Sequence, residues 1–233
     1  ISTNVLNFQD WISPDAMKMS RNTATAARAS KSAPRRYSSG QASQQQIIAA
    51  AESVLKRDGY HAFTTRRVAE QCGISVGNLT YYFPTKVTLI EALMDAVFGR
   101  YERFAEEIRS RKGGDGNTRV EAIVNWLLRD AVTPDTASLF LELWVMAKHH
   151  AFGADALTNF YDRGVHAIAT TLGEEYRELS ELELLRIGRF LLTLSEGCTA
   201  VFGRVGDEDA AHEEVVSMAV SIIESMVGRE PRR

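Results

Sequence analysis

The sequence has few cysteines, no long apolar run and none of several common catalytic motifs. Its two cysteines, Cys72 and Cys198, lie far apart. This spacing excludes a disulfide framework and a C-x-x-C metal or redox site, and it favours two buried thiols in a reducing compartment. Arg186 and Arg189 interrupt the apolar stretch at 184–194, so no uncharged run is long enough to span a bilayer. The absence of H-E-x-x-H, Walker and dinucleotide-binding patterns disfavours the enzyme classes that use them.

The beginning of the sequence lacks the features of a secretory signal. Its first twenty residues have neither a basic start nor an apolar centre, so we expect a cytoplasmic protein that does not associate with membranes. Residues 1–42 are rich in Ser, Ala, Thr and Gln, with scattered arginines and no apolar period, which predicts a basic and mostly disordered extension. Within it, Arg35 and Arg36 could reach DNA as an arm, or could belong to a solvated tail.

Charge is divided unevenly along the chain, although the net charge is only -3. Residues 20–86 contain ten Lys and Arg against three acidic residues, a balance of +7. Residues 87–233 contain sixteen against twenty-five, a balance of -9. A basic head on an acidic body indicates that the head contacts a polyanion.

From Ser43 onward the pattern is helical. Apolar residues recur at intervals of three and four, and no stretch alternates as a strand would. Capping boxes begin at Ser43, Thr118 and Ser180, and Pro134 can occupy the first position of a helix. The sequence therefore predicts an all-α fold of about nine helices. The later ones are expected over 119–132, 136–152, 155–177, 181–204 and 208–227, after a loop at 113–117.

Three short helices are predicted before Pro84. The first ends at Gly59, the second begins at Thr64 and stops at Gly73, and the third begins at Ser75. A helix, a glycine turn and a second short helix have the spacing of a helix-turn-helix. Glycine suits the turn because it adopts a left-handed backbone conformation without a steric penalty. The basic charge of this region favours DNA as the ligand of the motif.

The stretch FTTRRVAEQCGISVGNLTYYFPTKVTLIEAL at 63–93 resembles the DNA-binding region of TetR-family transcriptional repressors. The residues that carry the resemblance are Thr64, Ala69, Glu70, Gly73, Ile74, Ser75, Gly77, Leu79, Tyr81, Tyr82, Phe83 and Lys86. Two positions depart from the common pattern. Arg67 stands where many members have an acidic residue, and could face a phosphate. Thr80 stands where many have tyrosine.

The resemblance implies a ligand-responsive regulator, most simply a repressor, that binds a palindromic operator in double-stranded DNA as a homodimer. It implies a three-helix DNA-binding domain over 43–88 and a helical effector-binding and dimerisation domain over 89–228. Tyr82 and Lys86 would contact the DNA backbone. The complete set of predicted DNA contacts is Thr64, Thr65, Arg66, Val76, Gly77, Asn78, Thr80, Tyr81, Tyr82 and Lys86.

The second domain is expected to bind an apolar or aromatic small molecule and a partner chain. The candidate effector contacts are Phe104, Trp126, Trp144, His149, Phe160, Tyr161, His166 and Phe202. Among them, Trp144, Phe160 and Tyr161 could surround a cationic or aromatic effector. The apolar last two helices predict a dimer interface through Leu184, Ile187, Leu191, Leu194, Val215, Ala219, Ile222, Ile223 and Met226.

No cofactor is expected, and a metal site is disfavoured because the adjacent His149 and His150 point to different faces of a helix. Two other functions remain open from the sequence alone. One is a helical adaptor that binds protein partners through its apolar C-terminal helices. The other is an enzyme with an unrecognised site that contains histidine.

Overall fold

The computed structural model describes residues 35–110, 118–204 and 210–228, and side chains from Ser43 onward. The chain divides into two units, 1–40 and 41–233, and the account below concerns the second apart from the start of one helix. The predicted disorder of residues 1–34 and the predicted loop at 113–117 lie outside the described residues.

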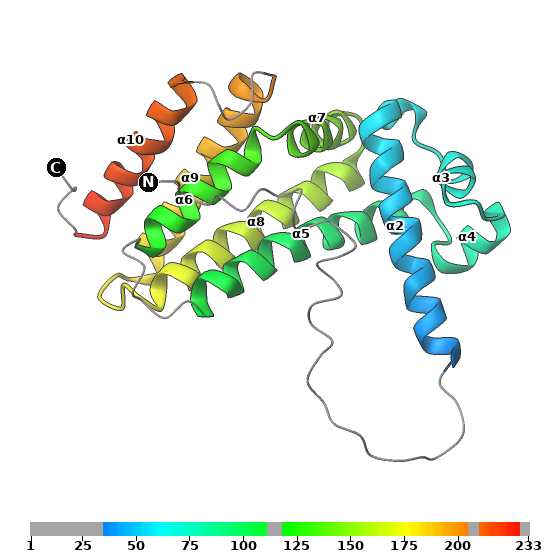
Figure 1. Cartoon of the computed structure of the whole chain (residues 1–233), viewed down its shortest axis with the longest axis horizontal. Coiled ribbons are helices and arrows are strands. Elements are labelled where there is room, and N and C mark those ends of the chain that lie inside the picture. Colours follow the sequence, from blue (N-terminus) through cyan, green and yellow to red (C-terminus); the bar gives the residue numbers. More distant parts are fainter. Residues whose placement is uncertain (1–34, 111–117, 205–209, 229–233) are drawn as a thin grey trace, which may run out of the picture. The chain divides into compact units, whose positions relative to one another are not determined.

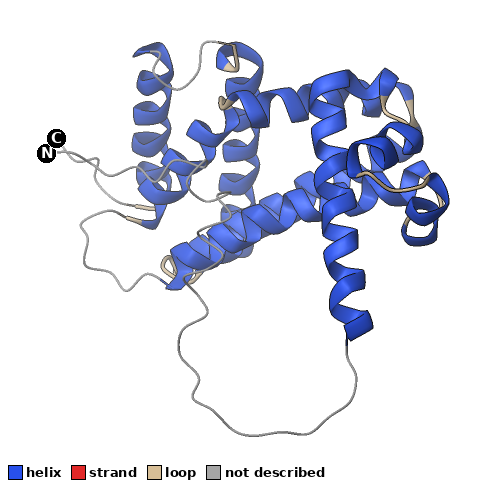
Figure 2. Cartoon of the chain, turned by 45° about the vertical axis from the view of Figure 1, so that its right-hand side comes forward, coloured by secondary structure: helices blue, strands red, loops and turns tan. Residues whose placement is uncertain are grey.

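The described residues form nine α-helices and no strand, which confirms the predicted all-α fold (Figures 1 and 2). The helices are α2 (Arg35–Ala62), α3 (Thr65–Cys72), α4 (Val76–Tyr82), α5 (Lys86–Ser110), α6 (Arg119–Ala131), α7 (Pro134–His149), α8 (Ala151–Gly173), α9 (Glu181–Phe202) and α10 (Ala210–Met226).

Helix α2 starts earlier than the sequence indicated. Its backbone is helical from Arg35, and the capping box at Ser43 does not begin the helix. The extension over residues 1–42 stays a prediction. No proline interrupts residues 35–62, which allows the helix to extend in this direction. The predicted stop at Gly59 is a kink, with φ 77° and ψ 167°, and one further turn follows it.

The other predicted caps are present. The side chains of Thr64 and Ser75 accept hydrogen bonds from backbone amides of the first turns of α3 and α4. Thr118 and Ser180 form complete capping boxes, and Thr133 caps α7 just before its proline. Each cap satisfies amides that a helix start leaves without an intrahelical partner.

The boundary between α7 and α8 differs from the prediction. The chain leaves the helix at His150 and resumes it at Ala151, and α8 ends at Gly173 rather than at residue 177. The junction is tight because a Cβ on Gly153 would lie 2.8 Å from the Met146 side chain. Nothing in the local apolar period indicates this contact between consecutive helices.

Two apolar clusters form the core. The first joins α2, α3 and α4 to α5, α7 and α8, and the second joins the end of α5 to α6, α8, α9 and α10. The first cluster contains Leu79 of α4 and also Leu89 and Leu93 of α5. Helix α5 therefore packs against the helix-turn-helix at one end and reaches the second cluster at the other (Figure 1).

Helices α8 and α9 pack closely at Gly188, where a Cβ would lie 2.8 Å from the backbone oxygen of Val165. We expect Gly188→Ala to lower the free energy of unfolding by about 1–3 kcal/mol, because the two backbones must separate. Gly99→Ala is the matched control, since a Cβ there makes an ordinary 3.6 Å contact with Arg103. Urea unfolding measures both variants, and equal stability of the two would contradict the packing argument.

Candidate DNA-binding surface and effector cavity

The turn between α3 and α4 has the geometry that the sequence predicted. Gly73 adopts φ 70° and ψ 28°, and its amide bonds to the carbonyl groups of Ala69 and Glu70. The Ser75 side chain accepts from the Asn78 amide at 3.1 Å and begins α4. Leu79 is fully buried, which seats α4 against the first apolar cluster.

The letters of this turn also match G-x-S-x-G, the pattern of a hydrolase nucleophile elbow, at Gly73–Gly77. That motif requires a strand before the serine, whereas here the helix α3 precedes it. Ser75 is engaged as the cap of α4, and no histidine bonds to it in the described part of the chain. The serine is therefore structural.

Helix α4 presents its predicted DNA-reading residues to solvent. Val76, Gly77 and Asn78 are exposed, and Tyr81 is 80% exposed. The ring of Tyr82 is half-buried and meets the Tyr81 ring edge-on, with 5.2 Å between centroids. Apart from this contact with Tyr82, most of the Tyr81 side chain is open to solvent.

Thr80 is half-buried, and its hydroxyl donates to the Gly77 carbonyl at 3.1 Å. Its hydrogen is thus used inside the helix. A base contact by Thr80 would have to come from the methyl group or from the hydroxyl oxygen acting as an acceptor.

The predicted contacts at the start of α3 lie on the same exposed side of the motif. Thr64 and Arg66 are exposed, and Thr65 is half-buried. Arg66 pairs with Glu70 of its own helix at 3.0 Å. Arg67 pairs with Asp58 at 3.2 Å, so its charge is shared with α2 rather than free for a phosphate.

Lys86 begins α5 directly beneath the motif. Its ammonium lies 3.9 Å from the centroid of the Tyr60 ring and 5.4 Å from that of Phe63. Partial burial lowers the pKa of Lys86 from its usual value. Among the described residues no carboxylate pairs with Lys86, so the rings hold the charge in place without neutralising it. Such a preoriented cation suits a phosphate group.

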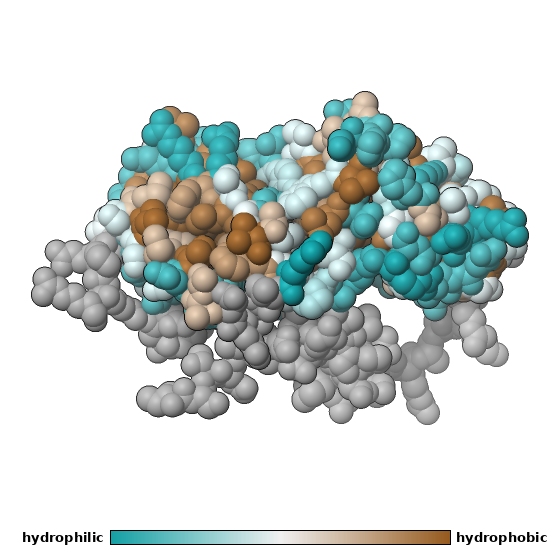
Figure 3. Space-filling model, turned by 90° about the horizontal axis from the view of Figure 1, so that it is seen from above, coloured by the Kyte–Doolittle hydropathy of each residue, from teal (hydrophilic) through white to brown (hydrophobic). Residues whose placement is uncertain are grey.

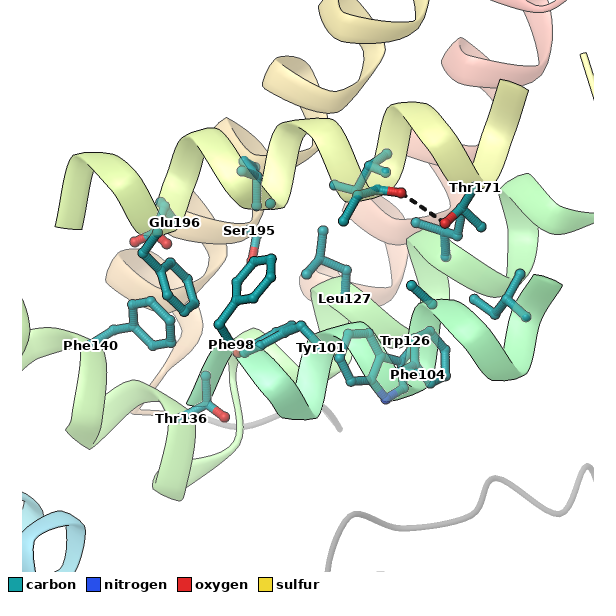
Figure 4. A pocket seen from close by; sticks show the side chains of 18 of the residues that line it. Phe98, Tyr101, Phe104, Trp126, Leu127, Thr136, Phe140, Thr171, Ser195 and Glu196 are labelled. Carbon is teal, nitrogen blue, oxygen red and sulfur yellow. Dashed lines mark hydrogen bonds between the residues drawn. The ribbon is translucent and has the colours of Figure 1, made fainter. Parts of the chain in front are cut away.

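A cavity lies among α5, α6, α7, α8 and α9 (Figure 4). Its lining residues are Phe98, Tyr101, Phe104, Ala105, Ile108, Ile123, Trp126, Leu127, Thr136, Phe140, Phe160, Gly164, Ala167, Ile168, Thr171, Leu192, Ser195, Glu196 and Thr199. The space open to the centre of a water molecule is ≈ 60 Å³. This corresponds to about five waters, or about 150 Å³ of liquid, which is the volume of a small organic molecule.

Three of the predicted effector contacts, Phe104, Trp126 and Phe160, line this cavity. The rings of Phe104 and Trp126 stack with 3.7 Å between centroids, toward the end of the cavity away from Phe140 and Glu196 (Figure 4). The remaining five, Trp144, His149, Tyr161, His166 and Phe202, are not among the residues that line it.

These five residues lie outside that wall, and their contact with an effector stays a prediction. His149 and His166 are exposed, and the His166 ring bonds to the carbonyl group of Asp162. Phe202 packs against the His212 ring at 5.4 Å. Trp144 donates to the Tyr161 hydroxyl at 2.9 Å, and the Tyr161 ring meets the Phe160 ring edge-on, with 5.9 Å between centroids.

Glu196 is the carboxyl group that the sequence analysis missed. It lies on the cavity wall near Phe140 (Figure 4), and the polar groups of Tyr161 and Trp144 lie close to it. Burial raises its pKa to about 7, although these two neighbouring polar groups act in the opposite direction. Its oxygen Oε2 is buried and has no hydrogen-bond partner in the described part of the chain. A glutamate inside an apolar helical run was the one available signal in the sequence.

A second carboxyl group, Asp130, is buried and accepts two hydrogen bonds at its oxygen Oδ2. It accepts hydrogen bonds from the hydroxyl groups of Tyr101 at 3.0 Å and Thr136 at 3.2 Å. Burial raises the pKa of Asp130, and these two donors oppose the rise. Asp130 thereby connects α6 to α5 and α7 behind the cavity wall.

The predicted dimer residues divide into two groups. Leu184, Ile187, Leu191, Ala219 and Ile223 are buried inside the subunit, because α6 and α8 cover that side of α9 and α10. Leu194 and Val215 are half-buried against the same cluster. Only Ile222 and Met226 of the predicted set are exposed. The buried members therefore belong to the core of one chain, which corrects their assignment to the interface.

A different apolar surface remains uncovered on these two helices. The exposed large apolar residues of these helices are Leu182 and Val201 on α9 and Met218, Ile222 and Met226 on α10, and we call this set the α9/α10 face. The three α10 residues recur every fourth position and so share one side of the helix. In Figure 3, hydrophobic side chains gather on the left, where α9 and α10 lie in Figure 1.

The described residues lack two features of other protein classes. They contain no cluster of three or more His, Cys, Asp or Glu side chains that could bind a metal. They also contain no helix that is both long enough and apolar enough to cross a membrane. Cys198 is buried and Cys72 is half-buried, and both are free thiols.

Comparison with known proteins places this geometry in context. Residues 47–93 match the family model of bacterial regulatory proteins of the tetR family. Over 141 residues the chain is 26% identical to an uncharacterized HTH-type transcriptional regulator encoded in the dhlA 5' region of Xanthobacter autotrophicus, covering 60% of this chain and 68% of the relative. Over 172 residues it is 24% identical to the HTH-type transcriptional regulator BetI of Escherichia coli, covering 72% and 87%.

A solved structure shares the fold. Salmonella enterica GusR superposes with a TM-score of 0.63 at 18% identity, covering 80% of this chain and 96% of that one. The likeness extends through the helical region after the helix-turn-helix.

Proposed function

The chain belongs to the TetR family of transcriptional regulators, and we propose that it is a repressor that binds a palindromic operator as a homodimer and is released by a small-molecule effector. The observation that best supports this proposal is that one helix, α5, connects the DNA-binding helices with the cavity. Helix α5 begins at Lys86, beneath the recognition helix α4, and its other half lines the aromatic cavity with Phe98, Tyr101 and Phe104.

For DNA binding, we assign α4 to the major groove. Val76, Gly77, Asn78, Thr80 and Tyr81 would face the bases, and Tyr82 and Lys86 would hold phosphate oxygens, with Thr64, Thr65 and Arg66 at the flank. Asn can bond adenine in two places, and lysine contributes charge without base preference. The exposure of Tyr81 and the unpaired charge of Lys86 support this division.

Two helices would carry an effector signal to α4. Helix α5 does so directly, and Arg100 on it pairs with Glu52 of α2 at 2.8 Å. Helix α7 contributes Phe140 to the cavity, and its Glu142 accepts the Tyr60 amide at 2.7 Å just after the α2 kink. An effector that displaces either helix would therefore shift the DNA-binding helices through contacts at the opposite end.

In a homodimer the two recognition helices must lie about 34 Å apart to enter successive major grooves. Effector binding would favour a state of the dimer with a different separation and so lower its affinity for the operator. The α9/α10 face is the surface that we assign to the partner chain, because it is apolar and uncovered. The protein would act by binding and not by catalysis, in the cytoplasm, where it has access to DNA.

Operator binding tests the DNA-binding assignment. We expect Lys86→Ala to weaken binding to all sequences and to reduce the slope of log affinity against log salt by about 1 per subunit. We expect Asn78→Ala to relax base preference, at a cost of about 1–3 kcal/mol on the operator. The measurement is a gel shift against operator and scrambled duplexes, after selection of the operator from genomic fragments.

Unchanged operator affinity and salt slope in Lys86→Ala would contradict its role at the backbone. Glu178→Gln, an exposed substitution in the turn after α8, is the control that should behave as wild type. The same selection separates the alternative functions, because a helical adaptor or an enzyme would not enrich a short palindrome.

A further inference from the structure

The cavity wall contains one carboxyl group, and no basic side chain of the described residues forms an ion pair with it. Glu196 is the one carboxyl group among its lining residues, and none of those residues is Lys, Arg or His. In the described part of the chain no ion pair involves Glu196, and its oxygen Oε2 has no hydrogen-bond partner. Glu196 as a whole is half-buried, and a carboxylate with one buried and unpartnered oxygen is costly unless a ligand supplies the missing partner.

Six of the other eighteen lining residues are aromatic, and the rest are aliphatic residues, glycine, serine and threonine. Phe160 meets the rings of Phe98 and Phe140 edge-on, each at 5.6 Å between centroids, and the ring of Tyr101 at 5.9 Å. The faces of such rings carry negative potential and attract a cation that has been removed from water. The carboxylate and the rings therefore select for the same property of a ligand, which is positive charge on an apolar body.

We propose that the effector of this protein is an organic cation, an alkylated ammonium with an apolar or aromatic substituent, whose charge lies between Glu196 and the rings of Phe98, Phe140 and Phe160. This inference rests on the proposed function and specifies its ligand. The apolar substituent would extend toward Phe104 and Trp126, which lie toward the other end of the cavity (Figure 4).

Neighbouring charges do not fill this role. Arg163 lies over the ring of Phe98 at 3.9 Å, but it pairs with Asp95 and does not line the cavity. Arg100 is engaged by Glu52. Asp130 on α6 would add to the negative potential if ionised, and Tyr101 and Tyr161 are neutral donors whose pKa values are raised by burial. The groups around Glu196 thus leave its charge for a ligand.

A pair of probes of equal shape tests the charge. Phenyltrimethylammonium is a cation with no N–H donor, and tert-butylbenzene is the same molecule with carbon in place of nitrogen. Binding of each to the full chain is measured by calorimetry at pH 8, where Glu196 is mainly ionised. We expect wild type to prefer the cation, and Glu196→Gln to weaken cation binding by about 30-fold or more. Binding of tert-butylbenzene to Glu196→Gln should be unchanged or tighter.

The pH dependence provides a second measurement that does not require a variant. Because burial raises the pKa of Glu196 to about 7, protons should compete with the cation below that pH. Wild-type affinity for the cation should fall up to tenfold per unit as pH decreases from 7, whereas Glu196→Gln should show a flat profile. Glu178→Gln, which removes an exposed carboxylate, should follow wild type.

Equal binding of the two probes by wild type, or an undiminished cation affinity in Glu196→Gln, would overturn the inference. The proposed function is judged separately by gel shift of wild type with its selected operator. If tert-butylbenzene released the protein from its operator and the cation did not, the cationic effector would be rejected and the ligand-responsive repressor retained. Failure to select any operator would reject the repressor, while the calorimetry would still decide the ligand class.

Discussion

Ile222→Asp is expected to convert the dimer to a monomer and to abolish high-affinity operator binding. Ile222 lies at the centre of the exposed row on α10, between Met218 and Met226, and is itself 43% exposed in the single chain. In a two-fold interface the substitution enters twice, so two carboxylates would have to lose water against apolar surface. A cost of about 3 kcal/mol or more raises the dissociation constant of the dimer at least about 100-fold.

Sedimentation equilibrium measures the dimer, and gel shift measures operator binding at the same protein concentration. The matched control is Leu141→Asp on α7, because Leu141 is 44% exposed and lies outside the α9/α10 face. The control should remain dimeric. If Ile222→Asp also sediments as a dimer, another surface makes the interface. If it is monomeric but binds the operator with wild-type affinity, the two-fold model of DNA recognition fails.

The helix-turn-helix could be predicted residue by residue because its signals are local. A cap at Thr64, a left-handed glycine at Gly73 and a cap at Ser75 act within one or two turns of chain, and each is present at the predicted position. Helical periodicity also predicts that the Leu79 side chain is buried and that the Tyr81 side chain is exposed. Local chemistry also fixed the starts of α6, α7 and α9.

The proposed dimer surface could not be derived in the same way. The apolar run of α9 is wide, but periodicity alone does not tell which part of it the subunit's own helices cover. Packing against α6 and α8 buries Ile187 and Leu191, whereas Leu182 and Val201 stay exposed. On α10, packing within the subunit buries Ile223 and leaves the neighbouring residue Ile222 exposed to solvent. The helix contacts, and not the residue types, decide this.

The cavity shows the same limit. Phe104, Trp126 and Phe160 were identified as large aromatic residues, but Trp144 and Tyr161 have the same character and lie outside the wall. Glu196 was not predicted to line the cavity, because a single acidic residue in a helix is usually exposed to solvent. Its burial results from the meeting of α7, α8 and α9, which brings Trp144 and Tyr161 to its carboxyl group.

Glu196→Gln is expected to stabilise the protein at alkaline pH and to leave its stability almost unchanged at acidic pH. Burial raises the pKa of Glu196 from 4.5 to about 7 in the folded chain. Below pH 4.5 the carboxyl group is protonated in both the folded and the unfolded state and contributes no difference. As pH rises toward 7, the unfolded chain releases the proton that the folded chain retains, so wild type loses stability with increasing pH. The total loss is about 3 kcal/mol above pH 7.

Glutamine has the shape of the protonated side chain and cannot ionise, so the variant should avoid this loss. Urea unfolding of both proteins at pH 5 and pH 8, at one fixed protein concentration, gives the difference. Asp130, whose pKa is also raised by burial, is present in both proteins. Its contribution to the pH dependence of stability therefore cancels in the difference between them. Glu178→Gln, at an exposed position, should track wild type at both pH values. If Glu196→Gln were less stable than wild type at pH 8, the carboxylate would have an internal partner, and the case for a cationic ligand would lose its physical basis.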